Sequence, residues 1–212
     1  PFENGEGVLD APSLYHGEVS SHPERNNHEA RFFGLGCASQ GYFVTQPDYT
    51  GYGIAVETEH PYTHHDSLGT QSAHMVLAGI SFAAQLGIEL EPGVFLMGWS
   101  EGGGAGLAAQ KLLEASVPQV PVRASSLLAG PYHMSNRIGR FVLKTRDDES
   151  TSIYNWSVYV HNHLSDNPIA HESLWRYRVD NERDALRVPS NNPGEIYADD
   201  IKAHHEQLDA LF

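Results

Sequence analysis

One five-residue turn constrains this chain more than any other feature: residues 98–102 read Gly-Trp-Ser-Glu-Gly, with Ser100 at the centre. The apolar run Val94–Met97 before it is typical of a short buried strand, and the small-residue run 102–113 after it is typical of a helix. A strand-to-helix turn this tight predicts strained backbone angles at the serine and a collision of any side chain at either glycine. The helix would then direct the N–H groups of its first turn at the serine. Chance produces the Gly-x-Ser-x-Gly pattern in roughly one chain in ten, but the strand and helix around it favour a catalytic nucleophile.

The composition narrows the classes of protein that this chain can belong to. Its 212 residues suffice for one well-filled core and are too few for two large ones. The formal charge of −14, with only 13 Lys and Arg residues, argues against binding to nucleic acid, because phosphate contacts need clustered basic side chains. The longest apolar stretches fall far short of the ~20 residues that a transmembrane helix needs. The single cysteine, Cys37, excludes an intrachain disulfide.

Strand and helix signals alternate over the first 130 residues of the chain. This alternation predicts an α/β fold with a mostly parallel sheet and helices on both faces. The longest helical pattern, 67–86, is amphipathic, with apolar side chains at helical spacing. The predicted strands are 13–17, 41–45, 94–97 and 122–129, and the other predicted helices are 24–38 and 102–113.

The character of the sequence changes after Tyr132. Residues 133–212 are polar and rich in aromatic side chains, without another pair of buried parallel strands. Short helices are expected there, at about 151–164, 168–178 and 195–211. We therefore predict a core over residues 1–132 and a helical cap, or lid, over residues 133–212.

Several short motifs accompany the turn in a fixed order. They are His16-Gly17 at the end of the first predicted strand, Pro47–Gly53 (Pro-Asp-Tyr-Thr-Gly-Tyr-Gly) after the second, then His60–Tyr62 (His-Pro-Tyr), and Gly130–Tyr132 (Gly-Pro-Tyr) after the fourth. Together with the turn at Ser100, this order resembles the α/β-hydrolase superfamily, particularly its lipase and esterase branch with a helical cap. The resemblance covers about residues 10–135, and it extends only loosely to the rest of the chain.

The resemblance implies a serine hydrolase that cleaves small-molecule or lipid carboxylic esters through an acyl-enzyme on Ser100, without a cofactor. It implies an oxyanion hole made by the backbone N–H groups of Glu101 and Glu18, with Gly17 forming the turn that presents Glu18. His16 would help to shape that turn. Peptidases and acyltransferases use the same nucleophile turn, so both stay open as alternatives. Secretion is common among such lipases, which favours a secreted or periplasmic protein over a cytoplasmic one.

The catalytic acid and histidine are the point where this chain departs from the resemblance. An α/β hydrolase takes both from the ends of strands that follow the nucleophile, and no such strands are evident here. Asp166 with His204 or His205 is one candidate pair. The alternative that we favour places both residues on a segment missing from this chain, or on a second chain. The start at Pro1, without a methionine, indicates either a processed start or a piece of a longer protein. The fold's first two strands are also absent before residue 10, so we expect an incomplete hydrolase domain. A non-catalytic, hydrolase-like binding module is the remaining alternative.

Thirteen histidines raise the question of a metal site. None of them pairs with the cysteine or shows the His-Glu-x-x-His spacing, although His205-Glu206 begins in that way. We therefore expect no metal, and we interpret these histidines as solvated or capping residues.

Overall fold

The computed structural model describes residues 11–12 and 30–212, and it divides them into two compact units. Unit 1 comprises the described residues up to Thr58 together with His65–Gly130, and unit 2 comprises Glu59–His64 and Pro131–Phe212. The last boundary lies just before the division at residue 132 that the sequence suggests. The inclusion of residues 59–64 in unit 2 was not predicted.

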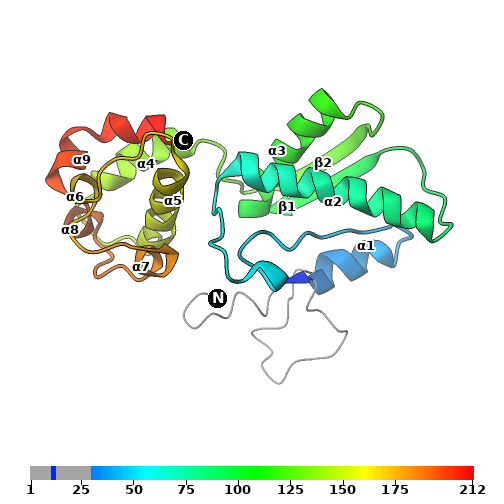
Figure 1. Cartoon of the computed structure of the whole chain (residues 1–212), viewed down its shortest axis with the longest axis horizontal. Coiled ribbons are helices and arrows are strands. Elements are labelled where there is room, and N and C mark those ends of the chain that lie inside the picture. Colours follow the sequence, from blue (N-terminus) through cyan, green and yellow to red (C-terminus); the bar gives the residue numbers. More distant parts are fainter. Residues whose placement is uncertain (1–10, 13–29) are drawn as a thin grey trace, which may run out of the picture. The chain divides into compact units, whose positions relative to one another are not determined.

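Unit 1 is built on two parallel strands, β1 (Val94–Trp99) and β2 (Val122–Leu128) (Figure 1). The register places Trp99 beside Leu128, with one irregularity directly after Val94. Both strands and their parallel direction confirm the sequence-based expectation. The direction follows from the connection, because parallel neighbours need a crossover such as a helix between them.

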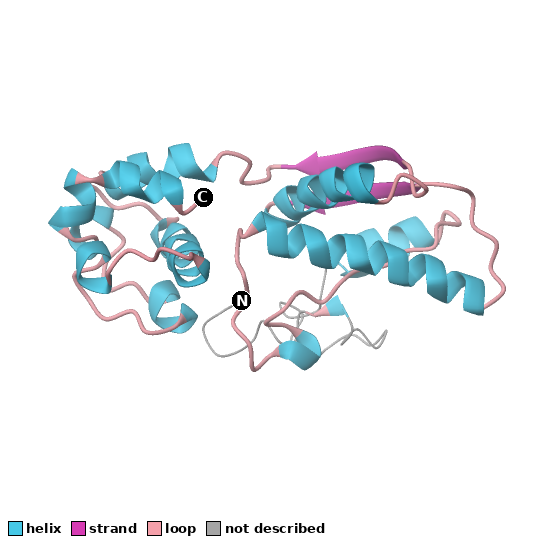
Figure 2. Cartoon of the chain, turned by 45° about the horizontal axis from the view of Figure 1, so that its top comes forward, coloured by secondary structure: helices cyan, strands magenta, loops and turns pink. Residues whose placement is uncertain are grey.

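Two helices, α2 (His65–Gln85) and α3 (Glu101–Ser116), lie on the same side of these strands (Figure 2). The core that they share with the strands contains Ala73, Ala109 and Leu113, lined by Val76, Val94, Leu96, Leu112, Val117 and Val122. A Cβ at Gly69 of α2 would lie only 2.5 Å from the Cβ of Ala108 in α3, so the glycine permits this close approach. Both helices confirm predicted ones to within a few residues at their ends.

The segment 41–45 is not a strand, contrary to the sequence-based prediction. A parallel strand needs a neighbour to bond with, and no segment of the described residues pairs with this one. Side-chain packing holds it instead, since a Cβ at Gly79 of α2 would lie 2.4 Å from the methyl group of Thr45. The predicted strand 13–17 lies outside the described residues.

Only the C-terminal part of the predicted helix 24–38 falls within the described residues. That part is a π-helix, η4 (Ala30–Leu35), which continues directly into α1 (Gly36–Ala38). The loop that follows ends in a single 3-10 turn, η5 (Gly53–Ala55). This loop carries the Pro-Asp-Tyr motif, so its anchoring bears on the candidate site.

Unit 2 is made of short helices. They are α4 (Met134–Val142), α5 (Thr151–Leu164), α6 (His171–Leu174), α7 (Glu182–Leu186), α8 (Pro193–Ile196), α9 (Asp199–Ala203) and the 3-10 helix η6 (His205–Ala210). α5 confirms the predicted helix 151–164, whereas α4 and α7 were not predicted. Within the part of the chain that the structure describes, no helix combines the length and the apolarity needed to cross a bilayer.

The predicted helices 168–178 and 195–211 are wrong over much of their length. The first ends at Leu174, and the second is broken into three short pieces. The cause is a non-local backbone pairing between the two segments. The Arg176 N–H donates to the Ile196 carbonyl, and the Ala198 N–H donates to the Leu174 carbonyl, each over 2.9 Å. A local periodicity cannot reveal such a pairing.

A buried polar network fixes the interior of unit 2 around Asn155 of α5. The Asn155 side-chain amide donates to the Tyr177 hydroxyl and to the Ala185 carbonyl, each over 2.7 Å. Its oxygen accepts a hydrogen bond of 2.8 Å from Nε1 of Trp175. Asn155 is fully buried, so this network replaces the water that its amide would otherwise bind.

Candidate active site

Ser100 lies at the sharp turn between β1 and α3, with φ 54° and ψ −121°. A positive φ is costly for any residue with a side chain, and such strain persists only where the surrounding structure enforces it. The preceding glycine makes the turn feasible, because a Cβ at Gly98 would lie 2.0 Å from the carbonyl oxygen of Gly102. The strained serine between strand and helix therefore forms as the sequence predicts.

The second glycine of the turn does not have the role that the sequence analysis gave it. A Cβ at Gly102 would meet no atom of the described residues within 4 Å. The expected collision at this position is therefore wrong. The crowding acts in one direction only: the Gly102 carbonyl occupies the space beside Gly98, while the Gly102 Cα hydrogen points into open space.

The end of β2 supports the turn from the other side. The Ser100 N–H donates to the Leu128 carbonyl over 2.9 Å, and the Gly103 N–H donates to the Ser100 carbonyl over 2.9 Å. A Cβ at Gly103 would lie 2.8 Å from the Leu128 oxygen, so α3 begins in direct contact with the strand end. Ala129, the next residue, also has a positive φ, of 51°.

Glu101 begins α3 and presents its backbone N–H in the first turn of the helix. The dipole of an α-helix adds positive potential at its first turn. This geometry suits the oxyanion donor that the resemblance assigns to Glu101. The second assigned donor, Glu18, and its turn at His16 and Gly17 lie outside the described residues.

The Pro-Asp-Tyr loop is anchored on α2 close to the same turn. The hydroxyl groups of Tyr49 and Ser72 lie 3.1 Å apart, and both the N–H and the hydroxyl of Thr50 donate to Oε1 of Gln71. Burial raises the pKa of Tyr49, the bond to Ser72 opposes this, and the charge of Glu101 reinforces it. Because the charge of Glu101 raises the pKa of Tyr49, the Pro-Asp-Tyr loop belongs to the surroundings of the Ser100 turn in unit 1.

His65 is a neighbour of the turn that sequence reasoning missed. A Cβ at Gly104, one helical turn after Ser100, would lie 2.2 Å from Nε2 of His65, so the imidazole fills the space that this glycine leaves. The small residues of the 102–113 run were the available signal. They indicate that something packs closely on α3, but they do not say what it is.

The candidate acid and histidines all lie in unit 2. Asp166 is exposed, in the turn that follows α5. Nδ1 of His204 lies 3.7 Å from the carboxylate of Glu206, and Nδ1 of His205 lies 4.0 Å from the same carboxylate. Both histidines are therefore held beside Glu206, and the contacts of the described residues do not bring either of them to Asp166.

Two further histidines of unit 2, His161 and His64, have structural surroundings. Nδ1 of His161 lies 3.0 Å from the Leu211 carbonyl oxygen, and its Nε2 lies 3.2 Å from the Thr63 carbonyl oxygen. The ring of His64 packs against it, with centroids 5.3 Å apart. In the described ranges, no three His, Cys, Asp or Glu side chains gather as metal ligands do.

Several solved structures are similar to this chain. A Legionella pneumophila protein with a provisional assignment as a hydrolase superposes with a TM-score of 0.72 at 20% identity, over 92% of this chain and 57% of that one. The rice cell wall degrading esterase LipA from Xanthomonas oryzae superposes with a TM-score of 0.62 at 18% identity, over 75% and 47%. A ligand-bound form of LipA gives a TM-score of 0.54 at 22% identity, over 74% and 41%.

The chain has an α/β-hydrolase-like fold. At identities this low the likeness concerns the fold alone, and it agrees with the fold class that the sequence predicts. The chain spans about half the length of the hydrolases that it matches, 57% of the first and 47% of the second. No protein-family model matches the sequence, and no curated protein matches it.

Proposed function

We propose that this chain carries the nucleophile of a serine hydrolase that cleaves carboxylic esters, of the esterase or lipase type. The observation that carries the proposal is the strained backbone of Ser100 between β1 and the first turn of α3. Strain of this kind costs about 1–3 kcal/mol, and it collects at functional sites where it positions a reacting group. The hydrolase and esterase assignments of the similar structures support the same reaction class.

The reaction would proceed through a covalent acyl-enzyme. Oγ of Ser100 attacks the ester carbonyl carbon while a general base takes the hydroxyl proton. The carbonyl oxygen becomes an oxyanion that accepts a hydrogen bond from the Glu101 N–H, and a donor of this kind is worth ~10²–10³ in rate. The tetrahedral intermediate then collapses and expels the alcohol, which takes the proton from the general base. Water attacks the acyl-enzyme in the same two steps and releases the carboxylic acid.

The base and the acid that orients it belong to the proposal as well. Because His204 and His205 lie beside Glu206, the pair that either would form with Asp166 has little support from the contacts of unit 2. We infer instead that the histidine and the acid come from the remaining part of a longer hydrolase domain, or from a second chain. The share of the similar hydrolases that this chain spans supports that inference.

A fluorophosphonate probe tests the proposal, because it forms an adduct with an activated serine and leaves an ordinary serine unlabelled. The protein expressed from its complete open reading frame should be labelled at Ser100, as located by peptide mass spectrometry. The Ser100→Ala variant should lose the adduct and at least ~10³-fold of the turnover of p-nitrophenyl esters. Ser126→Ala, which removes an exposed serine from β2, is the matched control and should keep both.

The same experiment decides between the alternatives. Labelling that is equal in the wild type and in Ser100→Ala would exclude Ser100 as the nucleophile. A complete protein that is never labelled would instead be a non-catalytic module with a hydrolase-like fold. If Ser100 is labelled but the protein cleaves amides faster than esters, it is a peptidase. If the acyl-enzyme passes its acyl group to a second alcohol faster than to water, the protein is an acyltransferase.

A further inference from the structure

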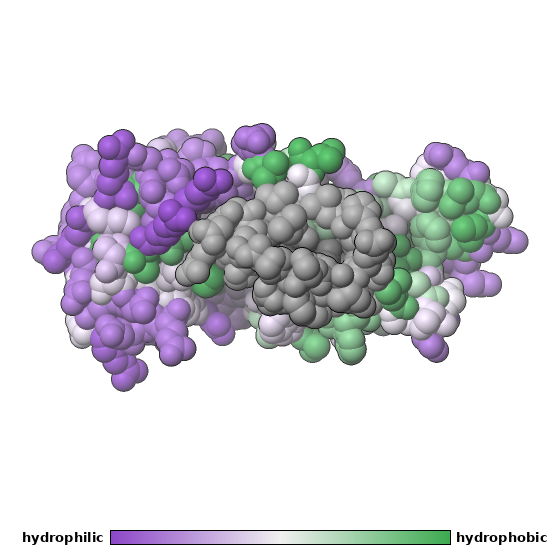
Figure 3. Space-filling model, turned by 90° about the horizontal axis from the view of Figure 1, so that it is seen from below, coloured by the Kyte–Doolittle hydropathy of each residue, from purple (hydrophilic) through white to green (hydrophobic). Residues whose placement is uncertain are grey.

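His161 lies inside unit 2 although its side chain can carry a charge. The surface of α4–α9 is mostly hydrophilic in the view of Figure 3, where it is purple. His161, near the end of α5, is only 7% exposed. A polar side chain keeps such a buried place only when it finds hydrogen-bond partners there. The chemical nature of these partners therefore decides which protonation state of His161 the folded protein favours.

Both ring nitrogens of His161 face backbone carbonyl oxygens. Nδ1 lies 3.0 Å from the Leu211 oxygen, and Nε2 lies 3.2 Å from the Thr63 oxygen. A carbonyl oxygen only accepts hydrogen bonds, so each nitrogen needs a proton of its own to bind it. A neutral imidazole ring has one such proton, whereas the imidazolium ion has two. Only the charged form of His161 satisfies both contacts.

The hydroxyl group of Thr63 does not replace the second proton. Its oxygen lies 3.5 Å from Nε2 of His161, and it donates to the Tyr62 carbonyl over 2.7 Å. Nε2 therefore faces two oxygen atoms that offer it no proton. In a neutral ring, one nitrogen would direct its lone pair at a carbonyl oxygen in a buried place, which is costly. Burial by itself favours the neutral ring, and this repulsion opposes that preference.

The backbone of Thr63 is strained at the same contact. Its φ is 57°, and its side chain is 2% exposed. A positive φ is an outlier for a β-branched residue, and it persists only where the surroundings enforce it. The bond from Nε2 of His161 to the Thr63 oxygen is one of these restraints. Loss of the Nε2 proton would turn the restraint into a repulsion and allow the strained turn to relax.

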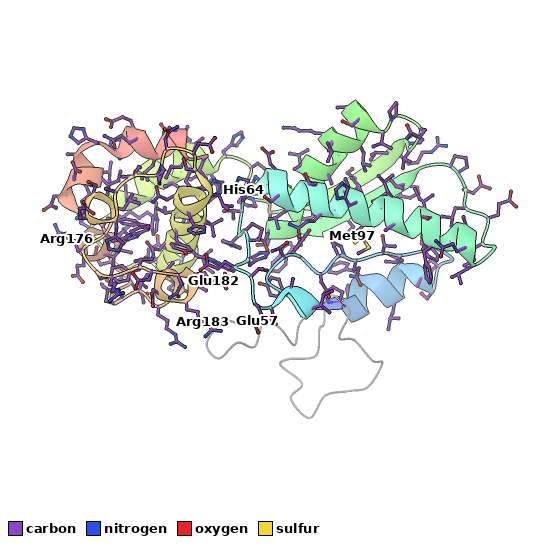
Figure 4. The ribbon with its side chains drawn as sticks, viewed as in Figure 1. Glu57, His64, Met97, Arg176, Glu182 and Arg183 are labelled. Atoms are coloured by element: carbon purple, nitrogen blue, oxygen red, sulfur yellow. The ribbon has the colours of Figure 1, made fainter. Side chains whose placement is uncertain are left out.

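Titratable groups face the ring of His161 from two sides. His64, labelled in Figure 4, comes from the same segment as Thr63, and its ring centroid lies 5.3 Å from that of His161. A charge on His64 would oppose a charge on His161. The ring of Phe212 stacks on His161 with centroids 3.9 Å apart, and a polypeptide that ends at Phe212 carries its terminal carboxylate there. That carboxylate would favour the imidazolium, so its effect needs a separate control.

We propose that His161 is a pH-sensitive clasp, which holds residues 59–64 and 211–212 on α5 while its ring carries both protons. Histidines of an unfolded chain release this proton near pH ~6.5. The folded chain holds it more tightly, so the contribution of the clasp to stability is complete below about pH 6.5. This contribution is lost at higher pH, where the proton leaves to water and one of the two segments is released. The clasp lies within unit 2, and it exists or fails whether or not Ser100 is catalytic.

His171 is a matched control within the same unit. Its Nε2 accepts a hydrogen bond of 3.0 Å from the Val179 N–H, so this nitrogen carries no proton in the folded chain. Proton–nitrogen correlation NMR of the chain with isotope-labelled histidines shows which ring nitrogens are protonated. At pH 7 we expect two ring protons on His161 and one, on Nδ1, on His171. The variants His161→Gln and His171→Gln assign the two sets of signals.

Hydrogen–deuterium exchange measures the release of the clasp. The Tyr62 and His64 N–H groups report on residues 59–64, because they donate to carbonyl oxygens within this segment over 2.8 and 3.0 Å. After correction for the intrinsic dependence on pH, we expect their protection to fall about tenfold between pH 6.5 and pH 8.5. In His161→Gln the protection should be equally low at both pH values, whereas His171→Gln should keep the tenfold change.

Glu182 requires a control of its own, because it also holds this segment. Its carboxylate accepts a hydrogen bond of 3.0 Å from the His60 N–H. Glu182→Gln removes this second titratable group and leaves His161 in place. The tenfold change in the protection of Tyr62 and His64 should therefore persist in this variant.

Three results would overturn the proposal. The first is a single ring proton on His161 at pH 6, which the wild-type spectrum reveals even if His161→Gln does not fold. The second is equal protection of Tyr62 and His64 at pH 6.5 and pH 8.5 in the wild type. The third is loss of the second ring proton when a neutral Gly-Ser tail follows Phe212, which would assign the charge to the terminal carboxylate instead of the carbonyl oxygens.

Discussion

The backbone N–H of Ser100 donates to the carbonyl oxygen of Leu128 over 2.9 Å, and this bond fastens the strained turn after β1 to the last residue of β2. Ala129 follows directly and has a positive φ of its own. One strained residue, Ser100, therefore donates this hydrogen bond, and a second, Ala129, directly follows its acceptor. Such strain is maintained by packing rather than by local preference, so the candidate nucleophile depends on the integrity of the whole sheet in unit 1.

The two glycines of the turn should respond differently to the same substitution. Gly98→Ala places a methyl group 2.0 Å from the Gly102 oxygen, and we expect a loss of roughly 2–4 kcal/mol in the free energy of unfolding. Gly102→Ala meets no atom of the described residues within 4 Å and should stabilise α3 by about 0.5–1 kcal/mol. Urea unfolding followed by circular dichroism measures both. Equal effects would contradict the one-sided crowding that the structure shows.

The buried amide of Asn155 should be among the costliest side chains to remove from unit 2. Asn155→Ala leaves the Trp175 indole N–H and the Ala185 carbonyl without their partner, and we expect a loss of about 2–4 kcal/mol. The exposed Asn167→Ala is the control and should change stability by less than about 0.5 kcal/mol. Thermal unfolding monitored by tryptophan fluorescence gives the comparison. A small effect of Asn155→Ala would show that water replaces the amide.

Asp148, which binds Ser150 at the start of α5, should make the stability of unit 2 sensitive to acid. Its carboxylate accepts hydrogen bonds from Lys144 and from the hydroxyl and N–H of Ser150, and these bonds lower its pKa from 3.8 to about 2. A lowered pKa in the folded state contributes stability that is present above the ordinary value and is lost as the pH falls toward about 2. Asp148→Asn should therefore flatten the loss of stability over this window. Asp180→Asn, which removes an exposed partner of Arg178, should keep the wild-type slope in the same urea titrations.

Glu182 should make stability depend on pH in the opposite direction to Asp148, and at higher pH. Burial raises its pKa above the usual 4.5, opposed by the hydrogen bond from the His60 N–H and reinforced by the charge of Glu59. The folded state then holds this proton more tightly, so stability falls as the pH rises through the window just above 4.5. Glu182→Gln should remove that slope, and the exposed Glu172→Gln should retain it. Unfolding free energies measured at pH 4, 5, 6 and 7 would refute the assignment if both variants kept the same slope.

The nucleophile turn could be predicted because its determinants are local. β1, Ser100 and α3 are encoded within about twenty consecutive residues. In each of them, the residue propensities and the spacing of apolar residues agree with the structure that forms. The one error in this region, at Gly102, came from treating both glycines alike. Which glycine is crowded depends on where a single carbonyl oxygen points, and composition does not contain that information.

The parts of the structure that the sequence did not predict depend on contacts between residues far apart in the chain. Residues 41–45 have strand-like composition but find no pairing partner among the described residues. Trp175 leaves the helical pattern because its backbone pairs with Tyr197 and its indole binds Asn155. His65 approaches α3 only because α2 crosses it there. Each of these outcomes is set by tertiary contacts that override local preference.

Residues 59–64 belong to unit 2, although the chain on either side of them belongs to unit 1. The polypeptide therefore changes unit at both ends of this segment and again after Gly130. Glu59 accepts hydrogen bonds from the Tyr159 hydroxyl and from the Glu182 N–H. A single-crossover chimaera joined after Gly130 would give these donors an acceptor from the wrong parent. Recombination between related chains can therefore exchange unit 2 intact only with three breakpoints together, one at each end of residues 59–64 and one after Gly130.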